Sequence, residues 1–128
     1  MLPAFVGGAA CFAGCGGCAP LRACQFLQER LHASIRPDSH DVAHVGDIDA
    51  QIDCTLNAVS AIYESRGLSL KNVSGALVYL KEERYRANWE AWLDAHPEYP
   101  REHSRAIVAD VCRDEWLFEI ESDAMQWK

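Results

Sequence analysis

The chain has 128 residues, of which 49% are apolar and 24% charged, and its formal net charge is −7. This composition is typical of a globular domain, and the acidic balance argues against a nucleic-acid-binding surface, because phosphate contacts need clustered Lys and Arg. No apolar run reaches the roughly 20 residues of a membrane span, and no basic residue precedes Arg22 as a secretory signal would require. We therefore expect a cytoplasmic protein that binds neither nucleic acid nor membrane, with free thiols.

Residues 1–37 differ in composition from the rest of the chain. They hold five of the eight glycines and four of the six cysteines, three of these in "CFAGCGGC" (11–18) and the fourth at Cys24. The spacing resembles the cluster motif of radical-SAM enzymes, but 128 residues are too few for the barrel that surrounds such a cluster. A four-cysteine zinc site usually consists of two separated pairs. We therefore predict no metal and no cofactor, and a segment without a regular helical or strand period.

The first predicted element after this segment is a helix over 47–66. Asp47 can accept amide hydrogens of the first turn, and Gly67 supplies the stop after Arg66. Apolar residues recur at three- and four-residue steps and form one stripe: Ile48, Ile52, Leu56, Val59, Ile62 and Tyr63. The β-branched and apolar run that follows predicts a buried strand at 73–80.

A second helix is predicted over about 82–95, ended by Pro97. Two alternating segments follow at 104–112 and 116–124, and we expect "RDE" between them to form a tight hairpin connection. In the last strand Leu117, Glu119 and Glu121 share one face, since successive side chains of a strand point to opposite faces.

This order of elements predicts an α+β fold in which two helices pack on one face of a mostly open sheet. The step from strand 73–80 through the helix to strand 104–112 is expected to be parallel. The other sheet face, which carries Glu119 and Glu121 or their neighbours, has no predicted cover. A small domain with one covered sheet face usually oligomerises, and a closed ring of identical subunits is the simplest solution.

Several of these residues resemble the RidA superfamily, also known as the endoribonuclease L-PSP family. The resemblance covers roughly residues 44–124, and it rests on "HVGDIDAQ", the helix end at Arg66-Gly67, "VYL", Asn88 and "VCRDEWLFEIE". It implies a chorismate-mutase-like sheet with two helices on one face, and a homotrimer with its active sites in the clefts between subunits.

The resemblance also implies site residues. RidA deaminases hydrolyse reactive 2-imino acids: an arginine binds the substrate carboxylate, and the first glutamate of "EIE", here Glu119, positions or activates water. Alignment puts His103 in the place of that arginine, with Arg105 two residues further on the same strand face. A histidine is neither permanently charged nor bidentate. The implied catalytic residues are thus Glu119 and His103, and the implied substrate-binding residues are Arg105, Asn88 and Arg113.

Within the superfamily the closer likeness is to the RidA-like C-terminal half of chorismatases, the pteridine-dependent deoxygenase-like proteins. Their motifs appear here as His44–Asp47 with Gln51, and as Asp110–Arg113 with Glu119–Glu121. This likeness implies hydrolysis of chorismate or a related enol or keto-acid anion. Two other functions stay open: a deaminase of 2-iminobutanoate and 2-iminopropanoate, and a non-catalytic trimer that binds or regulates. In each case the expected partner is a small anionic metabolite.

Family members begin with a strand hairpin whose loop is close to "SGTASI", which residues 1–43 do not contain. Codons permitted for Phe26 to Ser34, taken from the third base of Phe26, can spell Gly-Thr-Ala-Ser. Two interpretations of the segment 1–37 therefore stay open: a disordered region, or translation out of frame. In both, the RidA-like domain spans 38–128.

Overall fold

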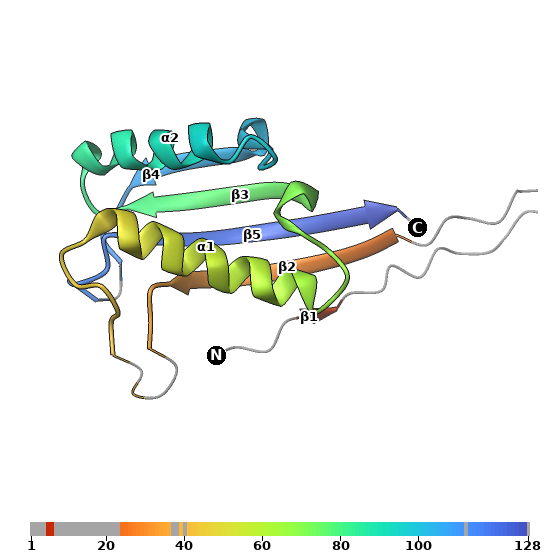
Figure 1. The fold of residues 1–128 in the computed structure, drawn as a ribbon, viewed down its shortest axis with the longest axis horizontal. Helices are drawn as coiled ribbons and strands as arrows, with labels where there is room; N and C mark the ends of the chain where they lie inside the picture. Colours follow the sequence, from red (N-terminus) through yellow and green to blue (C-terminus); the bar gives the residue numbers. More distant parts are fainter. Residues whose placement is uncertain (1–4, 7–23, 37–38, 40, 112, 128) are drawn as a thin grey trace, which may run out of the picture.

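The computed structural model describes residues 5–6, 24–36, 39, 41–111 and 113–127. Within this part of the chain, five strands form one sheet in the order β1-β2-β5-β3-β4, and two α-helices lie on one of its faces (Figure 1). No helix in the described part has the length and hydropathy of a membrane span. The elements are β1 Phe5–Val6, β2 Cys24–Ala33, α1 Ile48–Glu64, η1 Leu70–Asn72, β3 Val73–Leu80, η2 Glu83–Tyr85, α2 Arg86–Ala95, η3 Arg101–His103, β4 Ser104–Val108 and β5 Phe118–Trp127.

The first helix and the strand after it agree with the sequence pattern. Asp47 is the N-cap of α1, and its carboxylate accepts a hydrogen bond from the amide of Ala50 at 3.0 Å. Gly67 has a φ of +74°, in the left-handed region that favours glycine, and it turns the chain away from α1. The second helix begins later than predicted, because residues 83–85 form the 3-10 turn η2 before α2 starts.

The sheet confirms the parallel step and corrects the hairpin. β3 pairs with β4 in parallel, with Leu77 opposite Arg105, and with β5 antiparallel, with Leu77 opposite Glu121. The hairpin predicted between 104–112 and 116–124 is therefore wrong: β4 ends at Val108, and β5 lies on the other side of β3. Alternation shows that a segment is a strand but not which strand lies beside it. Placed between β2 and β3, β5 has hydrogen-bonding partners on both sides.

The segment before residue 38 contributes to the sheet. β2 pairs antiparallel with β5, with Ala33 opposite Glu119, so the expectation that residues 1–37 hold no strand is wrong for 24–33. The pairing with β5 is what the local pattern could not indicate, because strand pairing is decided by distant partners. The cysteine motif at 11–18 lies outside the described residues, and the boundary at 37/38 and the two interpretations of 1–37 stay predictions.

The core lies between the sheet and the two helices. The indole of Trp89 stacks on Trp92 with ring centroids 5.2 Å apart and contacts Phe118 of β5 at 5.4 Å. Tyr63 of α1 and Ser122 of β5 share a hydrogen bond inside this core, which satisfies two buried hydroxyl groups. The helices thus bury one face of β5, and the opposite face of the sheet is not covered by a helix.

Truncation of the central indole tests this arrangement. Trp89→Ala removes a side chain that is 2% exposed, and we expect a loss of about 3–5 kcal/mol in the free energy of unfolding, measured by urea denaturation. Val108→Ala is the control, because Val108 is 47% exposed at the edge of the sheet and should cost less than about 0.5 kcal/mol. Equal losses for the two variants would mean that the core does not lie under α2.

Candidate active site on the open face of the sheet

The sheet face away from the helices carries the candidate site, and we call it the open face. Alternation along β5 buries Phe118, Ile120 and Ser122 under the helices and turns the residues between them to the other side. Strand register places the neighbouring side chains of β3 and β4 beside them. The open face is thus defined by Glu119, Glu121 and Asp123 of β5, Gly75, Leu77 and Tyr79 of β3, and Arg105 and Ile107 of β4.

Glu119 is the most unusual group on this face. Glu119 is buried, with an exposed fraction of 3%, although neither helix covers this face of the sheet. Its Oε1 atom has no hydrogen-bond partner among the described residues. Burial raises the pKa of the Glu119 carboxyl from its ordinary value of 4.5. A buried carboxyl without a partner costs folding free energy, and a perturbed carboxyl in such a position is a candidate for acid–base chemistry.

Tyr79 lies directly beside Glu119 in the register of β3 and β5. Its hydroxyl donates a hydrogen bond of 3.1 Å to Oε1 of Glu121. Burial raises the pKa of the Tyr79 phenol, and the hydrogen bond to Glu121 and the charges of Glu121 and Glu119 add to the effect. The phenol therefore keeps its proton and acts as a donor to the carboxylate of Glu121.

The predicted site residues fall into two groups. Arg105 lies on β4 opposite Leu77, so the structure brings it to the same face as Glu119. His103 ends η3 just before β4, is exposed, and shares a 2.9 Å hydrogen bond between its Nδ1 atom and the carbonyl of Val73. Asn88 lies in the helix layer instead, where its amide donates to Asp49 of α1 at 2.9 Å.

Arg113 lies in the loop that leads from β4 to β5. Its guanidinium stands over the indole of Trp116, with the carbon Cζ 5.1 Å from the ring centroid. The indole in turn donates through Nε1 to the carbonyl of Ser34 at 2.9 Å. The structure therefore gathers Glu119 and Arg105 on one face, and it places Arg113 at the entrance to β5 and Asn88 on the helix side.

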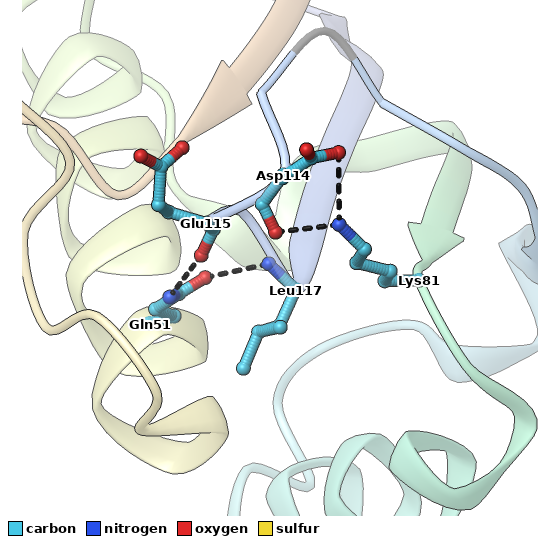
Figure 2. Close-up of polar contacts among 5 residues, drawn as sticks. All are labelled: Gln51, Lys81, Asp114, Glu115 and Leu117. Atoms are coloured by element: carbon cyan, nitrogen blue, oxygen red, sulfur yellow. Dashed lines mark hydrogen bonds and ion pairs between the residues drawn. The ribbon is translucent and has the colours of Figure 1, made fainter.

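Gln51 holds this loop from the side of α1 (Figure 2). The side chain is fully buried, and its amide nitrogen donates to the carbonyl of Glu115 at 2.9 Å and to that of His44 at 3.2 Å. Its amide oxygen accepts a hydrogen bond of 2.9 Å from the backbone N–H of Leu117. One buried amide thus satisfies three backbone groups that no strand partner reaches, and it fixes where β5 begins.

Lys81, the residue after β3, holds the same loop from the other side (Figure 2). Its ammonium donates to the backbone carbonyl of Asp114 at 2.5 Å and lies 3.4 Å from the Asp114 carboxylate. Its backbone N–H donates to the carbonyl of Leu117 at 3.1 Å. The loop is therefore held at both ends of the short segment that precedes Glu119.

Sequence reasoning missed part of the site. The alternation of the last strand placed Glu121 on the face of Glu119 without giving it a role, and Asp123, which continues that face at the next two-residue step, was missed although the same alternation could have found it. Tyr79 and Gln51 belong to the motifs quoted from the sequence, but their contacts could not be predicted, because their partners are distant in sequence. Within the described ranges, no group of three His, Cys, Asp or Glu side chains is placed to hold a metal ion.

Comparison with known proteins identifies the fold. No family model and no curated protein matches the chain. Among solved structures, a Thermotoga maritima protein aligns with 20% identity over 80% of each chain and a TM-score of 0.69. RidA from a Psychrobacter species aligns with 21% identity over 77% of this chain and 79% of that one, with a TM-score of 0.67. A Mycobacterium tuberculosis member of the YjgF/YER057c/UK114 family aligns with 21% identity over 77% of each chain, with a TM-score of 0.60. The chain thus has the α+β fold of RidA-like structures, as its motifs imply.

Replacement of Gln51 tests the loop contacts. In Gln51→Leu the carbonyls of His44 and Glu115 and the N–H of Leu117 lose their partner, so we expect a loss of about 2–4 kcal/mol in urea denaturation. Hydrogen exchange at the Leu117 amide should speed up more than exchange within α2. The control is Asn57→Ala, an exposed position on the same helix. An unchanged Leu117 exchange rate in Gln51→Leu would rule out the contact.

The pH dependence of stability tests the burial of Glu119. The unfolded carboxyl ionises near its ordinary pKa of 4.5, whereas the buried one ionises only at higher pH, so the penalty of burial is absent below pH 4.5, grows as the pH rises from 4.5 to the raised pKa, and is constant above it. Glu119→Gln removes the penalty, so we expect it to raise the Tm measured at pH 8. The gain should vanish near pH 4. A gain that is independent of pH would contradict the assignment.

Proposed function

We propose that the chain is a member of the RidA superfamily that hydrolyses a 2-imino acid to the 2-keto acid and ammonia, with Glu119 as the catalytic residue. The observation that carries the proposal is the buried carboxyl of Glu119, whose Oε1 has no hydrogen-bond partner among the described residues and whose pKa is raised by burial. The fold of RidA-like structures and the "EIE" motif support the same choice.

The chemistry needs one group that moves a proton in both directions. Water adds through its oxygen to the imine carbon and loses one proton while the nitrogen gains one, which gives a carbinolamine. The hydroxyl proton of the carbinolamine then passes to the nitrogen as the carbon–nitrogen bond breaks, which releases ammonia and leaves the carbonyl. A carboxylate can take the proton from water and return it to the nitrogen, and a raised pKa brings both protonation states closer to neutral pH. The raised pKa of Glu119 fits this role.

Arg105 is the group that we assign to the substrate carboxylate. It lies on the open face, and a guanidinium binds a carboxylate through two parallel hydrogen bonds. His103, in the position of the family arginine, uses its Nδ1 atom on the carbonyl of Val73, which leaves Nε2 for a polar contact at the edge of the site. Arg113 lies over Trp116 and would line the approach to β5.

The open face needs a second copy of the chain to become a cleft. Ile107 and Met125 are 41% and 38% exposed, and apolar groups at such positions favour association. A homotrimer would cover them. Asn88 bonds Asp49 in the helix layer of its own chain, so only an Asn88 from a neighbouring subunit could reach the open face. The proposed active site is therefore shared between subunits, and sedimentation should give three times the monomer mass of 14.3 kDa.

Chorismate hydrolysis is the second candidate function, and the motifs His44–Asp47 and Asp110–Arg113 favour it. Chorismate carries two carboxylates, however, and the open face already holds those of Glu119, Glu121 and Asp123. Because like charges repel, this face is better matched to a substrate with a single carboxylate. A trimer that binds its ligand without turnover is the remaining alternative, and the same assay decides among the three.

The assay measures hydrolysis of freshly generated 2-iminopropanoate and of chorismate. We expect turnover of the imine, and we expect Glu119→Gln to lower kcat/KM by at least about 100-fold, because the proton transfer is lost. Glu98→Gln, an exposed glutamate beyond α2, is the matched control and should keep full activity. Turnover of chorismate alone would select the second candidate. If a stable trimer turned over neither substrate, the proposal that the chain is an enzyme would be refuted.

A further inference from the structure

One edge of the sheet is formed by β4, and its outer side pairs with no strand in the part of the chain that the structure describes. Ile107 and Val108 at this edge are 41% and 47% exposed. The outer side of an edge strand carries backbone N–H and C=O groups that can bond to a strand of another molecule. The proposed hydrolysis makes no use of these groups, so the fold has to deal with them separately.

The backbone groups of every second residue of β4 face this outer side. The N–H of Ala109, just after β4, donates to the carbonyl of Leu80 at 3.0 Å, so the backbone groups of Ala109 face β3. Because the N–H and C=O of successive residues in a strand point to opposite sides, residues with odd numbers face β3 and residues with even numbers face away from it. The outward backbone groups of β4 are thus those of Ser104, Ala106 and Val108. A strand of another molecule would have to bond to these groups.

Arg86, the first residue of α2, covers the middle of the edge. Its Nη1 atom donates to the outward carbonyl of Ala106 at 3.1 Å. Its Nε and Nη2 atoms donate to the two carboxylate oxygens of Glu83 at 2.5 and 3.1 Å. This two-point contact fixes the plane of the guanidinium. The side chain therefore occupies the outer side of β4, where an added strand would lie about 4.8 Å from β4.

A second contact occupies the start of the edge. The N–H of Ser104 donates to the carbonyl of Arg101 in the turn that η3 forms before β4. Ala106 packs against the core, so the carbonyl that Arg86 binds is held in place. Together the two contacts take one donor and one acceptor away from any added strand.

We propose that Arg86, oriented by Glu83, closes the edge of β4 against pairing with a strand of a second copy of this chain. Each copy offers the same exposed edge, so a second copy is the partner that is always present. Its strand would have to displace the guanidinium from the carbonyl of Ala106. If two copies met edge to edge in a symmetric pair, their Arg86 side chains would also face each other, and like charges repel. Association is then left to other surfaces, such as the open face, whether or not the chain hydrolyses an imine.

Arg86→Met tests the closed edge, because methionine keeps an apolar stem and loses every donor. Sedimentation velocity over a wide range of concentrations measures the fraction of protein in species larger than the wild-type oligomer. We expect Arg86→Met to raise this fraction by at least about threefold at the highest concentration, because the edge is then open. The control is Arg84→Met, which makes the same change at a residue that bonds to Glu82 and Tyr85 and should keep the wild-type distribution.

A second substitution shows whether the larger species form through β4. Val108→Pro removes an outward N–H and no hydrogen bond to β3, and proline is tolerated at such positions of edge strands. The double variant Arg86→Met/Val108→Pro should therefore return to the wild-type distribution. Hydrogen exchange gives a readout that does not depend on the double variant: in the larger species of Arg86→Met, exchange at the amides of Ala106 and Val108 should slow down.

An unchanged size distribution in Arg86→Met overturns the proposal. So do larger species that form equally in Arg84→Met, that persist in the double variant, or whose Ala106 and Val108 amides exchange as fast as in the wild type. Dissociation of Arg86→Met into species smaller than the wild-type oligomer also overturns it, because Arg86 would then hold a neighbouring copy instead of excluding one.

Discussion

The alternation of side chains along β5 is the constraint on which the rest of the molecule depends. Phe118, Ile120 and Ser122 must face the helices, because Phe118 contacts Trp89, Ser122 hydrogen-bonds to Tyr63, and all three residues are buried. A strand leaves no choice for the residues between them, so Glu119 and Glu121 must face the other way. The same packing that stabilises the core therefore fixes the carboxylates on the open face. A shift of one residue in register would exchange the two sets and destroy both core and site.

The start of β5 is set by side chains that lie far away in sequence. The loop from β4 to β5 has to cross the end of β3, and its backbone groups would lack partners there. The buried amide of Gln51 supplies them from α1, and Lys81 supplies them from the end of β3 (Figure 2). These contacts join the first turn of α1 and the end of β3 to the segment before β5. They hold the strand that presents Glu119.

The local elements could be predicted from the sequence, whereas the neighbours of β5 could not. Asp47 and Gly67 mark the ends of α1 because capping and left-handed turns are local events. The position of β5 between β2 and β3 depends on pairs as distant in sequence as Cys24 and Trp127, and alternation carries no record of the partner. Glu119 came from a resemblance, and Arg105 from its place on the same strand face as His103. The contacts of Tyr79 and Gln51 emerged only with the structure.

The central claim is that the fold buries the carboxyl of Glu119 on the open face and thereby prepares it for proton transfer. The most direct test is a carbon-13 NMR titration of the glutamate carboxyl groups, with the Glu119 signal assigned by its loss in Glu119→Gln. We predict that Glu119 titrates above the ordinary value of 4.5. Titration of Glu119 at or below 4.5 would contradict the account.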